Sequence, residues 1–449
     1  YKDKMDNSVF LVGCLVLFTL GNVGGKSCSS TDTDWGSPNK LPILSGDKLA
    51  TYVNETTQGI LYEWRLDDGV TIPLVHVYGS AYEQGCAQGK LLQDSVASFI
   101  NGAWDYCVEN VYDAIVPYSK PWAARVIAVK GLAAALDMEY EITVNWTSPD
   151  FYQELHGIAD CAGVDYDKVR RLHQIPGITK GACSMFGSWG DAVADPGNSM
   201  VQFRSLDWDM NGPWVDYPSI TVYHPEGPDG LGHPYLNVGF PGWAGALTGI
   251  SAAGLAISEI GVTYPDDSFG AEQGMIPLPG TPFIDLLRNV LKYDDSLPAA
   301  LDRMRVAQRT ENLILGVGDG DLQRFRSVQY GPDVFTVIGP GNFIPVAEWH
   351  PPVNNTVYHG MDWDCPSFNE ELGALLQANY GQISGVVTIR NIIGQLESGS
   401  NHIAVYDPVQ DSVWVSFARP HDVQGPENAY ERQFTEFSPS LLFRVAQPS

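Results

Sequence analysis

The pattern of hydrophobic and polar positions divides the chain into alternating helical and strand-rich stretches. Residues 70–79 (VTIPLVHVYG) resemble a strand, and a helical pattern follows from about residue 82 to residue 172. Short β-rich runs separated by Gly and Pro extend from Cys183 to about Val262. Further helices are predicted in TPFIDLLRNVLKY, SLPAALDRMRVA and NEELGALLQANYG, and further strands in NLILGVGD, HIAVYDP and SVWVSFAR. Residues 30–60 show no clear period.

This order of elements favours a layered α+β architecture with sheets between helices. The chain has 449 residues and is 44% hydrophobic, so it is long enough to bury a large core. No internal repeat or low-complexity tract is present, and the composition does not shift enough to mark a second domain.

An apolar run near the beginning, residues 9–20 (VFLVGCLVLFTL), is too short to cross a bilayer, which takes about 20 residues. Its length is typical of a secretory signal peptide, so residues 1–28 are predicted to be a signal peptide and leader. A buried helix or a retained anchor are the alternatives. No later run is long and apolar enough for a transmembrane helix, so we expect the mature protein to be soluble and without a membrane anchor.

Two further features fit passage through the secretory pathway. Sequons begin at Asn54, Asn145 and Asn354 and are candidate glycosylation sites. Removal of the signal would take Cys14 away and leave the other six cysteines, from Cys28 onward, in an oxidising lumen. If Cys183 stays free, the other five cannot all pair.

Charge and motif content exclude several classes of function. The chain has 53 acidic and 26 basic residues, a net charge of -27, which would repel nucleic acid and anionic membranes over most of its surface. The sequence pI of about 4.5 fits an acidic compartment, although many extracellular proteins are equally acidic. The nine histidines show no metal-ligand spacing, and GxSxG and phosphate-binding glycine loops are absent, so no metal or cofactor is expected.

Cys183 is the candidate nucleophile, within GITKGACSMFGSW and directly after Gly181-Ala182. A cysteine that becomes a chain N-terminus carries its own base, because its free α-amino group can accept the thiol proton. Such a site needs a carboxylate near the amine, a cation and oxyanion donors. Asp207 and Arg204, in FRSLDWD, could supply the first two. Taken singly, Cys183 fits a buried thiol or half of a disulfide, and the other two fit an ordinary ion pair.

Several stretches in the expected order resemble the cysteine N-terminal-nucleophile (Ntn) hydrolases. The group concerned contains the acyl-CoA:6-aminopenicillanic acid acyltransferase-like proteins, the acid ceramidases and the choloylglycine hydrolases. The matching stretches are GSAYEQGCAQGKLL, YQELHGIADCAGVDYDKVRRLH, CSMF with FRSLDWD, GFPGWAGALTGISAAGLAIS and HIAVYDPVQDSVWVSFA. Together they cover roughly residues 75 to 420.

The resemblance implies a four-layer αββα sandwich and self-cleavage between Ala182 and Cys183. Residues 29–182 would form a mainly helical N-terminal chain, and residues 183–449 the catalytic chain. Asp207 would hold the new amine, and Arg204 would orient Asp207 and the end of the substrate. The separation from Cys183 to Asp207, 24 positions, is longer than the family pattern and implies an enlarged hairpin at GSWGDAVADPGNS.

The family also places an oxyanion asparagine before the last long helix. Asn355, in HPPVNNTVYHGMDW, is the expected equivalent, with Asn342 and Asn312 as rivals. Glu259 could face the substrate pocket, but a glutamate in a strand is more often solvated, so it is left out of the catalytic set.

The function implied is a lumenal amidohydrolase, lysosomal or extracellular, that cleaves a linear amide of an N-acylated amine or lipid through a Cys183 thioester. An acyltransferase that uses the same thioester is one alternative. A non-enzymatic glycoprotein that keeps the fold for binding or assembly is the other.

Overall fold

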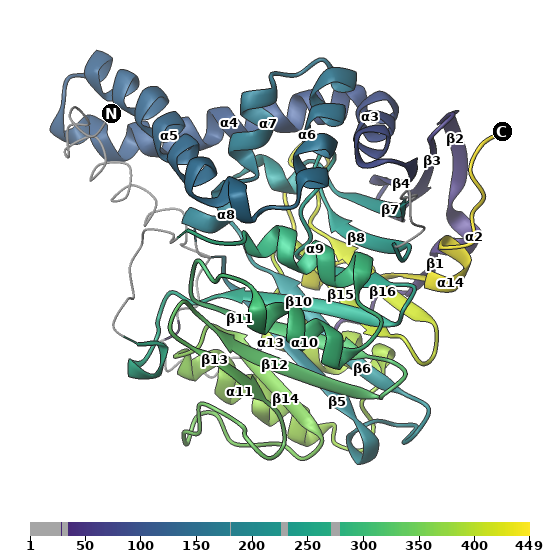
Figure 1. Cartoon of the computed structure of the whole chain (residues 1–449). Coiled ribbons are helices and arrows are strands. Elements are labelled where there is room, and N and C mark those ends of the chain that lie inside the picture. Colours follow the sequence, from purple (N-terminus) through teal and green to yellow (C-terminus); the bar gives the residue numbers. More distant parts are fainter. Residues whose placement is uncertain (1–27, 29–34, 180, 226–231, 271–278) are drawn as a thin grey trace.

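The structure is a computed structural model that describes residues 28, 35–179, 181–225, 232–270 and 279–449 (Figure 1). The predicted signal peptide therefore lies outside the described residues, apart from Cys28. Within the described ranges, no helix combines the length and the apolar character needed to cross a membrane.

Two β-sheets form the centre of the molecule, and the first has seven strands. All of its neighbouring strands are antiparallel except β1 and β17. In spatial order the strands are β1 (Leu44–Ser45), β17 (Thr435–Phe437), β16 (Ser412–Phe417), β15 (His402–Asp407), β6 (Met200–Leu206), β5 (Cys183–Trp189) and β14 (Thr356–Met361).

The second sheet has ten strands, and within it only β4 and β7 are parallel neighbours. In spatial order the strands are β13 (Phe335–Ile338), β12 (Arg324–Tyr330), β11 (Leu313–Asp319), β10 (Leu255–Gly261), β9 (Gly249–Ser251), β8 (Tyr235–Gly239), β7 (Ser219–Pro225), β4 (Thr71–Gly79), β3 (Gly59–Arg65) and β2 (Thr51–Thr56).

The two sheets pack face to face, and buried apolar side chains from both meet between them. One core cluster joins Ile220 and Leu236 of the ten-stranded sheet to Tyr406 and Val415 of the seven-stranded sheet. At the other end, Phe325 of β12 fills the space above Gly187 of β5, where a Cβ atom would come within 2.1 Å of its ring. Close packing of this kind fixes the relative position of the sheets.

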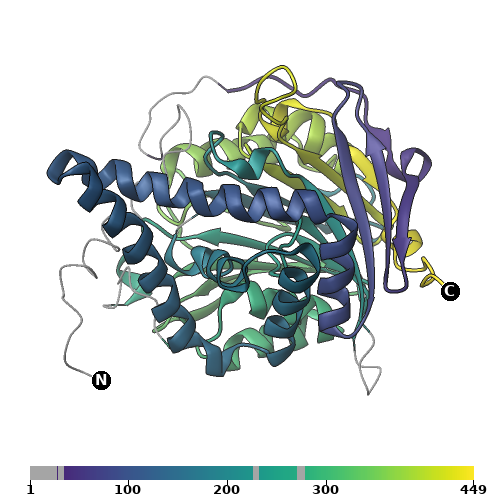
Figure 2. The same ribbon diagram turned by 90° about the horizontal axis from the view of Figure 1, so that it is seen from above.

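Helices cover the outer face of each sheet, so the molecule has the predicted four layers (Figures 1 and 2). The ten-stranded sheet is covered by α3 (Ala81–Leu91), α4 (Gln93–Ile115), α5 (Pro121–Thr143), α6 (Pro149–Ala162), α7 (Tyr166–Leu172), α8 (Ile175–Ile178), α9 (Phe283–Tyr293) and α10 (Leu297–Val306). The seven-stranded sheet is covered by α11 (Pro366–Ala378) and by the continuous segment of α12 (Gly385–Val387), η7 (Thr388–Ile393) and α13 (Gly394–Leu396). The short α2 (Gly46–Leu49) and α14 (Pro439–Leu442) lie near β17.

Glycines in two of the family-like stretches, GSAYEQGCAQGKLL and YQELHGIADCAGVDYDKVRRLH, allow α3 and α6 to pack backbone to backbone. A Cβ atom at Gly85 would lie 2.1 Å from the carbonyl oxygen of Glu154, and one at Gly157 would lie 2.1 Å from that of Tyr82. The contact is fastened by a disulfide between Cys86 of α3 and Cys161 of α6. The spacing of these glycines is therefore a packing requirement.

Most predicted elements are present in the structure. The main difference between prediction and structure lies in residues that showed no clear hydrophobic period. The predicted strand at 70–79 is β4, and the predicted helices near 283, 297 and 366 are α9, α10 and α11. Residues 51–65, which gave no clear strand signal, form β2 and β3 at the edge of the larger sheet. The side chains of β2 are mostly exposed, so the strand does not need the apolar alternation that marks a half-buried strand.

The strands β5 and β6 form the enlarged hairpin predicted from the long Cys183–Asp207 separation. They pair from Met185 opposite Arg204 to Trp189 opposite Met200, and residues 190–199 connect them. The extra length lies in this distal connection, so the end of the hairpin that carries Cys183 keeps its regular pairing.

Candidate active site

Cys183 is the first residue of β5, and its side chain is fully buried. It pairs with Met361 of β14 on one side. On the other side, the backbone N–H of Asp207 donates a hydrogen bond of 2.9 Å to the carbonyl oxygen of Ala182. The carbonyl group before Cys183 is thus held by a backbone donor at the point where the predicted cleavage falls.

Strand alternation separates the surrounding side chains into two groups. Cys183 and Arg204 point between the two sheets, because Met185, on the same face of β5, lies against Gly316 of the opposite sheet. Ser184 and Ser205 point the other way, towards the layer of α11 to α13. The polypeptide at Cys183 therefore runs between two polar clusters on opposite faces of one sheet.

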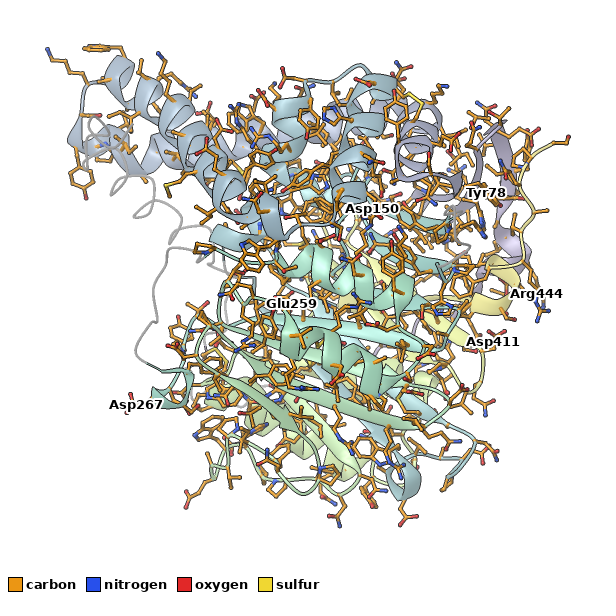
Figure 3. The ribbon with its side chains drawn as sticks, in the orientation of Figure 1. Tyr78, Asp150, Glu259, Asp267, Asp411 and Arg444 are labelled. Carbon is orange, nitrogen blue, oxygen red and sulfur yellow. A yellow bond between two sulfur atoms is a disulfide. The ribbon has the colours of Figure 1, made fainter. Side chains whose placement is uncertain are left out.

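The cluster between the sheets is centred on Arg204. Its Nη2 atom lies 3.4 Å from the Sγ atom of Cys183 and 3.3 Å from Oε2 of Glu259 on β10. All three side chains are buried. Figure 3 shows Glu259 inside the molecule, near the boundary between the helices above and the strands below. The arginine thus connects the thiol to a carboxylate from the opposite sheet.

His402 on β15 fixes the other side of the Arg204 guanidinium. The Nη1 atom of Arg204 lies 3.2 Å from Nε2 of His402, and the Thr248 hydroxyl oxygen lies 2.9 Å from the same ring nitrogen. A guanidinium can only donate, so Nε2 must be the acceptor and the imidazole must be neutral. Burial and the charge of Arg204 hold the pKa of His402 well below its usual value, in agreement with that tautomer.

The cluster on the outer face surrounds the Asp207 carboxylate. One oxygen accepts hydrogen bonds from the backbone N–H groups of Gly399 (2.8 Å) and Ser400 (2.9 Å), and the other lies 2.7 Å from the Ser398 hydroxyl. This arrangement corrects one predicted role. The side chain of Arg204 points to the opposite face, so Asp207 is oriented by residues 398–400 and receives only the long-range field of the arginine.

The buried positions of Cys183 and Asp207 change their protonation. Burial raises the pKa of the Cys183 thiol far above its usual range, although Arg204 acts in the opposite direction. Burial also raises the pKa of Asp207, against the lowering effect of its three hydrogen-bond donors. In the uncleaved chain the thiol is therefore neutral.

Asn355 does not belong to this site, and its predicted oxyanion role is wrong. The register of β14 and β5 places Met361 opposite Cys183, while Asn355 precedes Thr356, which pairs with Ser188. Six residues of strand separate the two ends, or about 20 Å at about 3.3 Å per residue. An oxyanion donor must lie about 3 Å from the reacting oxygen.

The two rival asparagines lie in different places. Asn342 is exposed and bonds its own loop through the carbonyl oxygen of Val337. Asn312 is buried and directly precedes Leu313, a residue of the pocket wall. Of the three asparagines, Asn312 is the one that is adjacent in sequence to a residue of the pocket wall.

A pocket of about 690 Å³, a volume that includes space open to solvent, adjoins the Arg204 cluster. Its wall is almost entirely apolar, and among the residues that the structure describes Glu259 is the only charged one that lines it. The aromatic lining residues are Phe99, Trp208, Trp214, Phe240, Trp243 and Phe283. Cavities of this apolar character bind apolar parts of small molecules.

The residues just before Cys183 form part of this wall. Thr179 and Gly181 line the pocket, as does Leu206, but Cys183 itself does not. A Cβ atom at Gly181 would lie 3.4 Å from the Trp208 ring, so the segment runs close to that side chain. The pocket wall thus comes within two residues of Cys183 along the chain.

Sequence reasoning named both Cys183 and Arg204 as site residues, and the structure brings their side chains into contact, but it missed four residues around them. His402 and Thr248 were quoted within matching stretches and given no role, and Glu259 was set aside as solvated. Ser398 carries no recognisable motif. Glu259 is only 5% exposed. Its strand β10 is buried on both faces, so it has no alternation of polar and apolar positions from which the burial of Glu259 could have been predicted.

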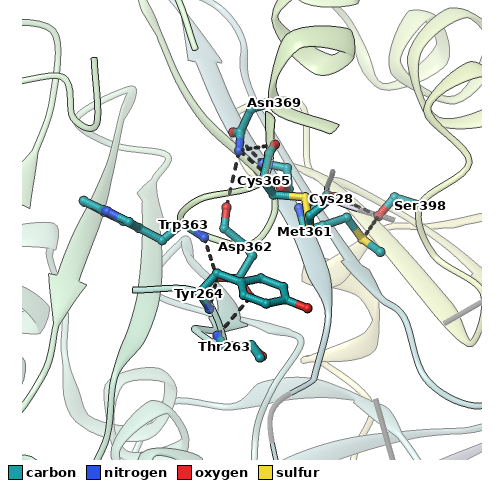
Figure 4. The surroundings of a disulfide bond; sticks show 11 residues. Cys28, Thr263, Tyr264, Met361, Asp362, Trp363, Cys365, Asn369 and Ser398 are labelled. Carbon is teal, nitrogen blue, oxygen red and sulfur yellow. Dashed lines mark hydrogen bonds between the residues drawn. A yellow bond between two sulfur atoms is a disulfide. The ribbon is translucent and has the colours of Figure 1, made fainter. Parts of the chain in front are cut away.

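Of the remaining cysteines, Cys28 and Cys365 form a disulfide beside the outer cluster, where Ser398 also contacts the Met361 sulfur atom (Figure 4). The predicted leader boundary at residue 28 conflicts with this bond. Cys107 and Cys183 are free and buried. In the described ranges, no group of three or more His, Cys, Asp or Glu side chains could hold a metal ion.

Comparison with known proteins places the chain beside two proteins of Dictyostelium discoideum. Protein dcd1A is 29% identical over 452 residues, which cover 96% of this chain and 97% of the relative. Protein dcd1B is 31% identical over 424 residues, covering 91% of this chain and 81% of the relative.

Other comparisons are more distant. No family model matches the chain. Among solved structures, a Caenorhabditis elegans N-acylethanolamine-hydrolyzing acid amidase ortholog is similar at a TM-score of 0.36 with 11% identity, over 56% of this chain and 98% of that chain. The extent and identity of the match to Protein dcd1B show that this chain belongs to the family of the dcd1 proteins.

Proposed function

We propose that the chain is an amidohydrolase that cleaves itself between Ala182 and Cys183 and then uses Cys183 as its nucleophile. The observation that carries the proposal is the position of Cys183. It is a free thiol at the start of a central strand, in contact with Arg204, and the preceding carbonyl group accepts the Asp207 N–H. A structural cysteine needs neither partner.

Self-cleavage would begin when the Sγ atom of Cys183 attacks the carbonyl carbon of Ala182. The Asp207 N–H is placed to stabilise the negative charge that develops on the carbonyl oxygen. The C–N bond then breaks, the nitrogen of Cys183 receives the thiol proton, and a thioester remains. Water hydrolyses the thioester and leaves a carboxyl group on Ala182 and a free amine on Cys183.

Turnover would repeat the same chemistry on an external amide. The free α-amine of Cys183 accepts the thiol proton and later delivers it to the leaving amine of the substrate, and water releases the acyl group as a carboxylic acid. The apolar wall of the pocket supports an apolar acyl group, such as that of an N-acylated amine or lipid. Displacement of the freed Gly181–Ala182 end would connect this pocket to the thiol.

We also propose that the protein matures in the secretory pathway, in a lysosome or outside the cell. Two disulfides support an oxidising compartment. The sequon asparagines Asn54, Asn145 and Asn354 are all exposed, as glycosylation requires.

The test is the chain composition of the purified protein. Cys28 and Cys365 lie on opposite sides of the Ala182–Cys183 bond, so the cleaved protein should run as one species without reductant and as two after reduction. Intact mass spectrometry should locate the break at that bond. Cys183→Ala should abolish both the break and hydrolysis of N-acyl amides, whereas Cys107→Ala, which removes the other free buried thiol, should abolish neither.

A chain that stays intact after reduction, in a protein that is folded and inactive, would favour the non-enzymatic alternative. Hydrolysis and acyl transfer are distinguished by adding an amine acceptor to the assay. An acyltransferase would divert the acyl group from the free acid to the acceptor, while a hydrolase would continue to yield the acid.

A further inference from the structure

The helical hairpin of α4 and α5 carries an exposed apolar tip far from the catalytic cluster. The two helices are joined by η2 (Val116–Tyr118), and in Figures 1 and 2 their joined ends project beyond the rest of the helical layer. Tyr118 is 89% exposed and Trp122 71% exposed, and Val126 and Val129 are also exposed. We call these four residues the hairpin tip.

The spacing of these residues gathers them on one face. Trp122, Val126 and Val129 are at positions i, i+4 and i+7 of α5, which lie on one side of a helix. At about 100° per residue, Arg125 lies roughly 60° to one side of Trp122 and Lys130 roughly 80° to the other. The apolar stripe is therefore bordered by a cation on each flank.

The local charge differs from that of the whole protein. The net charge of the chain is -27, yet residues 114–136 contain Lys120, Arg125 and Lys130 and no Asp or Glu. Acidic groups do approach from the neighbouring helix, because Glu109 of α4 pairs with Arg125 and Asp113 of α4 also acts on its charge. Lys120 and Lys130 together with Arg125 outnumber these two carboxylates and leave a small local positive excess.

We propose that the hairpin tip is a docking surface for an anionic lipid bilayer. Trp and Tyr side chains favour the interface between headgroups and acyl chains, and flanking Lys and Arg side chains reach up to acidic headgroups. The net negative charge of the chain repels such a membrane, so contact is favoured where acidic groups are sparse, as they are at the hairpin tip. Charge complementarity therefore selects both the partner and the orientation.

A second copy of the chain fits the tip less well. A stable interface buries about 800 Å² per partner. Two aromatic side chains supply about 150–250 Å² each, and two valines add too little to reach that area. A bilayer needs no large complementary surface, because it can accept a few inserted side chains.

Helix α4 connects the hairpin tip to the pocket. Phe99 and Ala103 of α4 line the pocket, and α4 ends at Ile115 beside the tip. Twelve residues of helix span about 18 Å. Docking at the tip would bring a bilayer close to an apolar cavity, although the docking itself does not depend on the proposed hydrolase activity.

The test is flotation of the full chain with vesicles of phosphatidylcholine alone and with added phosphatidylserine. The protein should float with the anionic vesicles, and salt should weaken binding. The double variant Tyr118→Ser/Trp122→Ser should bind at least about ten-fold more weakly. Lys120→Gln/Lys130→Gln should lose about five-fold per lysine. None of these residues touches the catalytic cluster, so amide hydrolysis of a soluble substrate should not change.

Matched controls distinguish specific membrane binding by the hairpin tip from nonspecific membrane binding. Trp35→Ser/Tyr52→Ser removes two other exposed aromatic side chains, and Lys48→Gln/Lys90→Gln removes two exposed lysines elsewhere. Both controls should float like the wild type. Absence of flotation by the wild type, equal flotation of all variants, or insensitivity to phosphatidylserine would overturn the proposal. So would a lipid-free dimer that Trp122→Ser converts to a monomer, which would show that a second copy covers the tip.

Discussion

The backbone N–H of Asp207 donates to the carbonyl oxygen of Ala182 at 2.9 Å, while residues 398–400 donate three hydrogen bonds to the Asp207 side chain on the far face of the same sheet. One residue therefore holds the Ala182 carbonyl with its main chain and, in the proposed mechanism, the future amine with its carboxylate. Both functions depend on how residues 398–400 fix that carboxylate, which makes this contact the most informative target.

Replacing Ser398 with alanine removes one of the donors to Asp207. Loss of a donor to the ionised carboxylate raises its pKa. We expect the acid limb of the rate of self-cleavage and of turnover to move to higher pH. Ser400→Ala is the matched control because it keeps the backbone N–H that Asp207 uses. Identical pH profiles for the two variants would contradict this role of Ser398.

The buried ion pair of Arg204 and Glu259 predicts strong coupling in stability. Removing either partner leaves a buried charge without its neighbour, which costs about 3–5 kcal/mol. Removing both costs less than the sum of the two single losses. We expect this in a double-mutant cycle of Arg204→Met and Glu259→Leu, measured by chemical denaturation in a Cys183→Ala background so that the chain stays single. Additive losses would show that the two side chains do not interact.

The pocket can be narrowed without touching the thiol. Leu247 lines the pocket and is only partly buried, so Leu247→Trp should fill space with little strain on the core. Self-cleavage should proceed normally, whereas KM for N-acyl amides should rise about ten-fold or more as the acyl chain lengthens. Leu322→Trp, at an exposed position, is the control. An equal effect on short and long acyl chains would argue against this pocket as the acyl site.

His173 predicts a loss of stability in acid. Its Nδ1 lies 2.7 Å from the Val169 carbonyl oxygen, and its Nε2 accepts the N–H of Ala244, so the folded protein holds the ring neutral. Burial lowers the pKa of His173 from 6.5 to about 4. The unfolded chain therefore binds a proton that the folded chain does not between those values, and the free energy of unfolding falls as pH falls through them.

The size of this effect is roughly 3 kcal/mol across that range, at 1.36 kcal/mol per pKa unit. His173→Gln should make the decline with decreasing pH shallower, which denaturant titrations at several pH values would measure. His156→Gln, at an exposed histidine, should leave the slope unchanged. The same slope for wild type and His173→Gln would contradict the buried neutral state.

More of the fold than of the candidate site could be predicted from the sequence. Hydrophobic patterning located β4, α9, α10, α11 and β11, because apolar residues recur along each of these elements. It gave no clear signal for β2, whose side chains are mostly exposed. The long separation of Cys183 and Asp207 also predicted the enlarged hairpin, since strand pairing leaves extra residues only in the connection.

Local sequence could not predict which side chains share a face of a sheet, or which ends of neighbouring strands meet. Arg204 and Asp207 are three positions apart, which suggested a direct contact, but strand alternation sends them to opposite sides of the sheet. Asn355 seemed well placed by its distance from the last long helix, yet the antiparallel register carries it to the wrong end of β14. Glu259 was predicted to be a solvated strand residue, but the seven-stranded sheet covers it.

By itself, the sequence determined the layered α+β architecture and the nucleophile candidate, because periodicity, composition and short motifs are local properties of the chain. Only the tertiary structure decided that Arg204 joins Cys183 to Glu259 and His402, and that Asp207 is held by residues 398–400. Apart from the contact between Cys183 and Arg204, these contacts link strands and loops more than fifty residues apart, and their geometry follows from sheet register and from the packing of one sheet on the other.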